Sequence, residues 1–207
     1  MDVLAKIKET KILPVIKIDN AKDAAPLAKA LIDGGLPAAE VTFRTDAAEE
    51  SIRTICREFP EMLVGAGSLT SVEQAKKAQE AGAQFFVTAG FHRGIAEYAV
   101  ENKIPYFPGI CTPSELMWLV EFGLPVAKFF PAGQMGGLKT IEAIGAAFPT
   151  MKFMPTGGVN ASNVRDYLAS DKIFACGGSW MVKDTLINEG RFDEITRLTR
   201  EAMDLVK

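Results

Sequence analysis

Short runs of apolar residues recur about every 20 to 25 residues along the chain, which is the spacing of repeated strand–helix units. The runs have the length and the near-continuous apolar character of parallel strands that are buried on both faces. We therefore expect strands at residues 12–18, 38–43, 63–66, 85–88, 105–108, 126–130, 152–155 and 173–176.

Helical patterns separate several of these runs. We expect helices at residues 21–31, 47–57, 72–81, 114–121 and 191–207, where apolar residues fall near helical spacing. Residues typical of helix starts precede three of them, namely Asn20, Asp46 and Ser71, and glycines typical of helix ends follow others, namely Gly34, Gly82 and Gly123.

Eight strand–helix units predict an α/β fold of the (β/α)8 TIM barrel type, formed as a single compact domain by residues 1–207. A chain of 207 residues is short for this fold, so the loops must be tight. A doubly wound open sheet is the alternative that the same alternation allows.

Composition narrows the class of function. Hydrophobic residues make up 48% of the chain and charged residues 24%, as in ordinary globular proteins. The net charge of −3 indicates no basic surface for nucleic acid. No apolar run is long enough to span a membrane, and the N-terminal residues lack a signal-peptide core, so we expect a cytoplasmic protein.

Histidine and cysteine are too sparse for several common kinds of site. His92 is the only histidine, which excludes a histidine-rich metal centre. Cys56, Cys111 and Cys176 are widely spaced and predict neither a disulfide framework nor a zinc site. These residues therefore argue against a histidine-rich or cysteine-rich metal site. His92 follows the fourth expected strand and is interpreted as a loop residue, with substrate contact as the alternative.

Lys128 is the unusual residue of the sixth expected strand, in the run Val-Ala-Lys-Phe-Phe that begins at Val126. Burying an unpaired ammonium group costs several kcal/mol, on the order of the known penalties for buried ions. A neutral amine in an enclosed site is a nucleophile toward carbonyl groups. The alternative is a lysine at a strand end whose ammonium group reaches water.

The second expected strand also carries polar side chains that we expect to point into the barrel interior, as Lys128 does. Glu40, Thr42 and Arg44 share one face of that strand, because alternate residues of a strand point the same way, and the other face is apolar. Lys128 and Phe130 likewise share one face of the sixth strand. Barrel interiors are packed mainly with apolar residues, so inward Glu40, Arg44 and Lys128 together predict an active site.

Pairs of glycines end the last two expected strands. Gly157 and Gly158 follow Thr156 after the seventh strand, and Gly177 and Gly178 precede Ser179 after the eighth. Barrels commonly bind phosphate at these two loops, where glycine lets backbone N–H groups approach an anion. A third segment, residues 65–68, ends the third strand and offers backbone N–H groups and the Ser68 hydroxyl to another anionic group.

Motifs along nearly the whole chain resemble the class I aldolases that act on 2-keto-3-deoxy-6-phosphogluconate (KDPG) and 2-keto-4-hydroxyglutarate (KHG). The most specific are E-V-T-F-R from Glu40 and K-F-F-P-A from Lys128, and the others are G-A-G-S, F-F-V-T-A-G, P-G-I-C-T-P-S-E, P-T-G-G and G-G-S-W-M-V. The resemblance implies a (β/α)8 barrel, a homotrimer and a Schiff-base mechanism without metal or cofactor.

The resemblance also implies roles for individual residues. Lys128 would form the Schiff base, Glu40 would be the general acid and base, and Arg44 would bind the carboxylate of pyruvate. The implied substrate site further contains Ser68, Ala89, Phe130, Thr156, Gly157, Gly158, Gly178 and Ser179. The three glycines and Ser179 would hold the phosphate. The reaction would cleave the keto-acid phosphate KDPG to pyruvate and glyceraldehyde 3-phosphate, with cleavage of KHG to pyruvate and glyoxylate as a second activity.

Three positions depart from the family pattern: Ser68 replaces threonine, Ala89 replaces proline, and Gly133 replaces glutamate. They leave open an altered-specificity or engineered pyruvate aldolase, and also a catalytically silent barrel used as an assembly subunit. A sugar-phosphate isomerase or epimerase that uses Glu40 as base is a further alternative.

Overall fold

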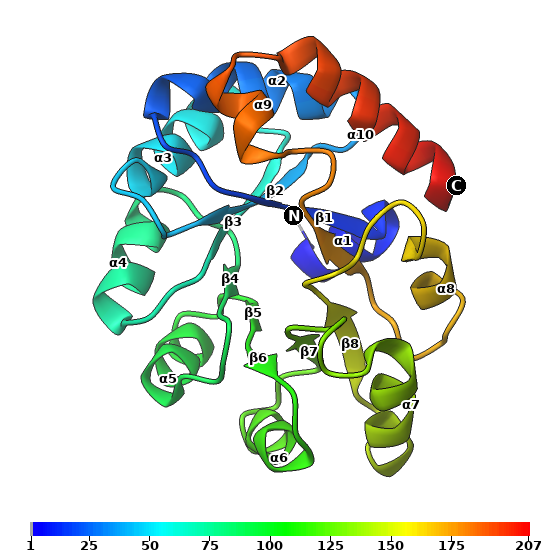
Figure 1. The fold of residues 1–207 in the computed structure, drawn as a ribbon. Coiled ribbons are helices and arrows are strands. Elements are labelled where there is room, and N and C mark those ends of the chain that lie inside the picture. Colours follow the sequence, from blue (N-terminus) through cyan, green and yellow to red (C-terminus); the bar gives the residue numbers. More distant parts are fainter. Residues whose placement is uncertain (1) are drawn as a thin grey trace.

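The computed structural model describes residues 2–207, and parallel strands form its centre with helices around the outside (Figure 1). Seven of the eight expected strand runs contain an observed strand in the expected place, several of them shorter or shifted at one end. The strand in the run at 105–108 is followed by a second short strand at residues 109–110, and the run at 173–176 is a strand only from residue 176. The strands are β1 (Ile12–Ile16), β2 (Ala38–Thr42), β3 (Leu63–Gly67), β4 (Phe86–Val87), β5 (Tyr106–Phe107), β6 (Gly109–Ile110), β7 (Val126–Phe129), β8 (Lys152–Pro155) and β9 (Cys176–Gly178).

The strands follow one another in sequence order. One sheet has the order β5-β4-β3-β2-β1-β9, and a second has the order β6-β7-β8. The first strand pairs with the last in parallel, with Ile12 opposite Cys176. Isolated parallel bridges from Phe153 to Ile173 and from Thr156 to Gly177 connect the second sheet to the segment that contains β9. The result is an α/β fold with a curled parallel sheet, without the reversal of strand order that a doubly wound sheet has.

Helices follow most strands and cover the outer side of the sheet, whereas α1 precedes β1 and lies near the middle of the view (Figure 1). They are α1 (Val3–Thr10), the 3-10 helix η1 (Ala21–Asp23), α2 (Ala24–Asp33), α3 (Ala48–Glu58), α4 (Val72–Glu80), α5 (Arg93–Glu101), α6 (Pro113–Glu121), α7 (Gly137–Ala147), α8 (Val164–Leu168), α9 (Asp184–Asn188) and α10 (Phe192–Val206). Within residues 2–207, none of them is both long and apolar enough to cross a bilayer.

Local sequence determines where several helices begin. The Asn20 side chain accepts a hydrogen bond from the Lys22 backbone at the start of η1, and the Ser71 side chain accepts one from Gln74 at the start of α4. Asp46 does not cap α3, since Ala47 is the N-cap residue and makes no side-chain capping bond. Thr112 and Glu115 form a capping box at the start of α6.

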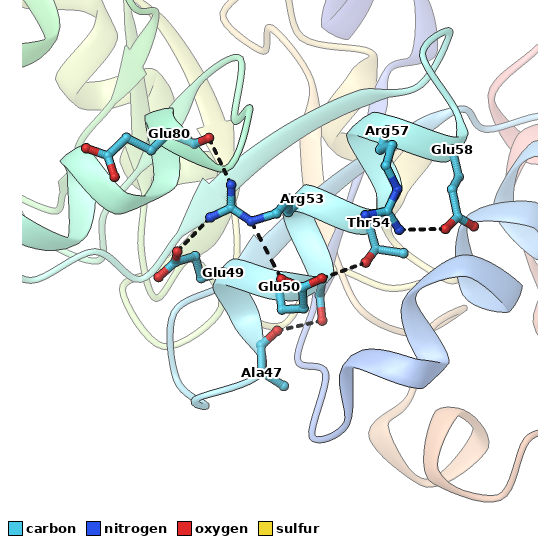
Figure 2. A network of polar contacts seen from close by, with 9 residues as sticks. Ala47, Glu49, Glu50, Arg53, Thr54, Arg57, Glu58 and Glu80 are labelled. Atoms are coloured by element: carbon cyan, nitrogen blue, oxygen red, sulfur yellow. Dashed lines mark hydrogen bonds and ion pairs between the residues drawn. The ribbon is translucent and has the colours of Figure 1, made fainter.

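The outer face of α3 carries a network of charged side chains (Figure 2). Arg53 contacts Glu49 at 2.8 Å and Glu50 at 3.6 Å, and it also donates a hydrogen bond at 3.3 Å to the backbone carbonyl of Glu80 at the end of α4. These groups are exposed, so each pair contributes at most about 1 kcal/mol to stability. The bond from Arg53 to Glu80 joins the middle of α3 to the end of α4, on the outside of the fold.

Candidate active site

Lys128 and Glu40 form an ion pair inside the fold. The Lys128 Nζ atom lies 3.3 Å from the Glu40 Oε1 atom, and the two residues are 4% and 0% exposed. Lys128 is on β7 and Glu40 is on β2, which belong to different sheets, so the contact crosses the interior. The interpretation of Lys128 as a strand-end lysine that reaches water is therefore wrong.

One polar atom of this ion pair lacks a hydrogen-bond partner. The Glu40 Oε2 atom is buried and has no hydrogen-bond partner among the described residues. The Lys128 Nζ atom also lies 5.5 Å from the centre of the Phe130 ring, a distance at which a cation is attracted to an aromatic face. Buried ion pairs contribute little net stability, so an incompletely bonded pair in the interior is a candidate for function.

Gly67 provides the space that Glu40 occupies. Gly67 lies on β3, next to β2, and a Cβ atom placed on it would overlap the Oε1, Cγ and Cδ atoms of Glu40. A glycine inside a strand often marks such a close approach. The absence of a side chain at Gly67 therefore allows the Glu40 carboxyl group to lie against β3 and face Lys128.

Thr42 orients Arg44, which follows the end of β2. The Arg44 Nε atom donates a hydrogen bond at 3.1 Å to the Thr42 Oγ1 atom. Thr42 in turn donates a hydrogen bond at 2.9 Å to the backbone carbonyl of Ile16, at the end of β1. Arg44 itself is exposed. This chain of bonds fixes the base of the guanidinium group while its far end stays accessible.

Two cavities meet at Arg44 and Phe130, which line both of them. The first, which we call the glycine cavity, has a volume of about 280 Å³ and is lined among others by Thr156, Gly157, Gly158, Gly178 and Ser179. The second, which we call the Ser68 cavity, has a volume of about 550 Å³ and includes Ser68 and Ala89 in its wall. The residues expected to bind substrate thus divide between two neighbouring cavities.

Backbone geometry makes the glycine cavity suitable for an anion. Gly157 and Gly158 have φ angles of 90° and 85°, which glycine adopts readily and other residues adopt at a cost. The backbone of Gly133 donates a hydrogen bond at 2.9 Å to the Gly157 carbonyl, which ties this loop to the one after β7. The Thr156 Oγ1 atom is buried and has no partner among the described residues. Accessible N–H groups in glycine loops of this kind form anion sites.

The Ser68 cavity has a strained residue at its edge. Ser68 has a φ angle of 57°, in the left-handed region that is uncommon for residues other than glycine. His92 also lines this cavity, but its Nδ1 atom accepts a hydrogen bond at 3.2 Å from the Ile95 backbone and caps α5. The interpretation of His92 as a loop residue is compatible with this capping role.

The sequence analysis missed Asp184 and the packing role of Gly67. Gly67 belongs to the segment 65–68, which was expected to offer backbone N–H groups to an anion, and it lies one residue beyond the expected strand at 63–66. In the structure β3 extends to Gly67, where a glycine allows the close approach of Glu40. Asp184 lines the glycine cavity from the start of α9, and no sequence pattern placed it there. Among residues 2–207, no three His, Cys, Asp or Glu side chains gather closely enough to hold a metal ion.

The curled parallel α/β fold holds a buried lysine–carboxylate pair, and the lysine lies near Phe130, which lines two cavities. These features are typical of an enzyme with an amine nucleophile. The family model described as "KDPG and KHG aldolase" matches residues 3–198, and the chain belongs to this family. The resemblance found in the motifs is confirmed. Since members of the family are aldolases, the chain belongs to the carbon–carbon lyases.

Individual relatives support this assignment over nearly the whole chain. The KHG/KDPG aldolase of Escherichia coli strain K12 is 43% identical over 95% of this chain and 92% of its own length. A KDPG aldolase of Legionella pneumophila, with pyruvate captured as a covalent carbinolamine intermediate, has a TM-score of 0.92 and 36% identity, covering 97% of both chains. The Zymomonas mobilis ZM4 enzyme, solved with 3-phosphoglycerate, has a TM-score of 0.90 and 36% identity, covering 97% of this chain and 94% of its own.

Proposed function

We propose that this chain is a class I aldolase that cleaves KDPG to pyruvate and glyceraldehyde 3-phosphate through a Schiff base on Lys128. The observation that carries the proposal is the buried Lys128–Glu40 pair, whose charged atoms are 3.3 Å apart. The Lys128 Nζ atom also lies 5.5 Å from the ring centre of Phe130, which lines both the glycine cavity and the Ser68 cavity. The carbinolamine named for the Legionella pneumophila relative is the first intermediate of this chemistry. Cleavage of KHG to pyruvate and glyoxylate is the second activity, supported by the family description.

The reaction begins with a proton transfer that the pair is placed to make. Glu40 accepts a proton from Lys128, and the neutral amine attacks the C2 carbonyl of the substrate to form a carbinolamine. Glu40 then gives its proton to the carbinolamine hydroxyl group, which leaves as water and produces an iminium ion, and Glu40 is a carboxylate again. The positive nitrogen accepts the electron pair of the C3–C4 bond as that bond breaks, while Glu40 takes the proton of the C4 hydroxyl group.

The products leave in two steps. The C4 fragment departs as the aldehyde, and an enamine remains on Lys128. Glu40 returns a proton to C3, and addition of water to the resulting iminium ion releases pyruvate and restores the amine. In this scheme Arg44 holds the substrate carboxylate beside Ser68, and the glycine cavity holds the phosphate. Remote binding of the phosphate positions the reacting carbons against Lys128.

The proposal extends to the architecture. The pairing of β1 with β9, and the bridges between β8 and the β9 segment, support closure of the sheet into a (β/α)8 barrel with β5 and β6 as one interrupted strand. Residues 1–207 would form this barrel as one domain. A homotrimer is also part of the proposal, and the exposed side chains of Met117, Trp118 and Val120 on α6 make this helix its candidate contact surface.

Borohydride reduction in the presence of pyruvate tests the proposed chemistry. We expect reduction to add the mass of a pyruvate-derived group to Lys128 and to abolish activity, because hydride addition converts the imine to a secondary amine that water cannot hydrolyse. Peptide mass spectrometry locates the modification. If no lysine is modified, the aldolase assignment fails, and an isomerase that uses Glu40 as base or a silent assembly subunit takes its place.

Gly67→Ala tests how Glu40 is positioned. The added methyl group would displace the Glu40 carboxyl group from Lys128, and a misplacement of about 1 Å can cost roughly 100-fold in rate. We therefore expect kcat/KM for KDPG to fall about 100-fold in a folded protein, with circular dichroism as the check on folding. A folded variant that keeps more than about a third of wild-type activity would contradict this placement of Glu40.

A further inference from the structure

Asp184 places a negative charge in the cavity proposed to hold phosphate. It is the first residue of α9 and lines the glycine cavity together with Gly158, Gly178 and Ser179. Its side chain is 51% exposed, so the carboxylate faces solvent at the wall of the cavity. A carboxylate in this position opposes the binding of a phosphate dianion.

Lys17 neutralises Asp184 only in part. The Lys17 Nζ atom lies 3.6 Å from Asp184 Oδ2 but 2.9 Å from Asp19 Oδ1, so one ammonium group is shared by two carboxylates. Asp19 also accepts a hydrogen bond at 3.0 Å from the Asn188 side chain, which holds it in this arrangement at the end of α9. Two carboxylates and one ammonium group leave one net negative charge in this cluster, of which Asp184 is the member that lines the cavity. Arg44 also lines the cavity, and its cation is the one expected to bind the substrate carboxylate.

The same carboxylate suits an uncharged polar group. An ionised aspartate only accepts hydrogen bonds, so it repels phosphate oxygens and attracts a hydroxyl donor. We propose that Asp184 is a specificity-determining residue that lowers the preference for a phosphorylated substrate and lets the cavity accept a 2-keto-3-deoxy acid ending in a free hydroxyl group. This inference rests on the proposed function, because it concerns the far end of the same substrate.

Asp184→Asn measures this effect, because it removes the charge and keeps the shape of the side chain. We compare kcat/KM for KDPG with kcat/KM for unphosphorylated 2-keto-3-deoxygluconate. We expect the ratio of the first to the second to rise roughly threefold to tenfold, because removing an exposed charge near an anion weakens a repulsion of this size. The change should be mainly in KM for KDPG. The rise should shrink in about 0.5 M NaCl, since salt screens exposed charges. Asp184→Glu should keep the wild-type ratio.

Glu189→Gln is the matched control. Glu189 directly follows α9, its side chain is 59% exposed, and it pairs with Arg191 outside the glycine cavity. Glu189→Gln removes one negative charge from the same region of the protein. We expect the substrate ratio to stay within about 1.5-fold of wild type, because an exposed charge away from the ligand has little effect on its binding.

Titration calorimetry measures the affinity for inorganic phosphate directly, without turnover of a substrate. Asp184→Asn should bind phosphate roughly threefold to tenfold more tightly than wild type, by the same charge argument. The proposal is overturned by a substrate ratio within about twofold of wild type, by an equal change in Glu189→Gln, or by equal or undetectable phosphate binding in both proteins. Failure of the aldolase assignment is separate, because borohydride trapping uses pyruvate, which carries no phosphate.

Discussion

Lys128→Met is expected to abolish aldol cleavage, lowering kcat by more than roughly 10⁴-fold, as loss of a covalent nucleophile does in other enzymes. Without the amine no iminium ion can form, and the C3–C4 bond has no electron acceptor. Methionine keeps an unbranched apolar chain of similar length, so it fills the space at Lys128 without adding a branch. Release of pyruvate, coupled to its reduction by lactate dehydrogenase and NADH, measures the loss.

Removing Lys128 also leaves Glu40 buried without its cation, which costs about 3–5 kcal/mol of stability when the carboxyl group stays ionised. The double variant Lys128→Met with Glu40→Gln avoids that charge and should unfold at a higher temperature than Lys128→Met alone. Lys152 on the neighbouring strand β8 is the matched control. Its ammonium group contacts the exposed backbone carbonyl of Asp171, so Lys152→Met should stay active. Catalysis or imine trapping that persists in folded Lys128→Met would place the nucleophile elsewhere.

The order and place of the strands could be predicted because each buried strand leaves an apolar run in the sequence. The expected run at 152–155 coincides with β8, whereas the run at 105–108 continues past its expected end. Pro108 has no N–H group to donate, and β5 and β6 lie on either side of it. The last strand, β9, begins at the end of its expected run and extends through Gly177 and Gly178, whose composition resembles a turn more than a strand.

The chemistry of the site could be predicted further than its shape. The alternation of residues along β2 and β7 correctly placed Glu40 and Lys128 in one interior, and the structure brings them together. The division of the substrate-binding residues into two cavities was not predictable. It depends on how the loops after the strands fold, and on small local features such as the left-handed backbone of Ser68. Asp184 enters the glycine cavity for the same reason, since α9 is short and follows an irregular segment.

Glu40→Gln is expected to lower kcat by roughly 10²- to 10⁴-fold, the usual contribution of a general acid or base. Glutamine keeps the shape that Gly67 accommodates and can accept a hydrogen bond from Lys128, but it cannot take a proton from the C4 hydroxyl group. Imine formation with pyruvate should persist, because solvent can take the Lys128 proton that Glu40 takes in the wild type. Borohydride should therefore still label Lys128 in this variant, more slowly than in wild type, while the cleavage assay shows little activity.

Exchange of the C3 protons of pyruvate in deuterium oxide separates the role of Glu40 from that of Lys128. Lys128→Met should show neither labelling nor exchange, whereas Glu40→Gln should show labelling with greatly slowed exchange, because the same carboxylate moves the proton at C3. Glu49→Gln, on the outer face of α3 near the protein surface, removes an exposed carboxylate that pairs with Arg53 and should leave exchange unchanged. Exchange in Glu40→Gln within about threefold of wild type would mean that another group, such as a bound water molecule, carries the proton.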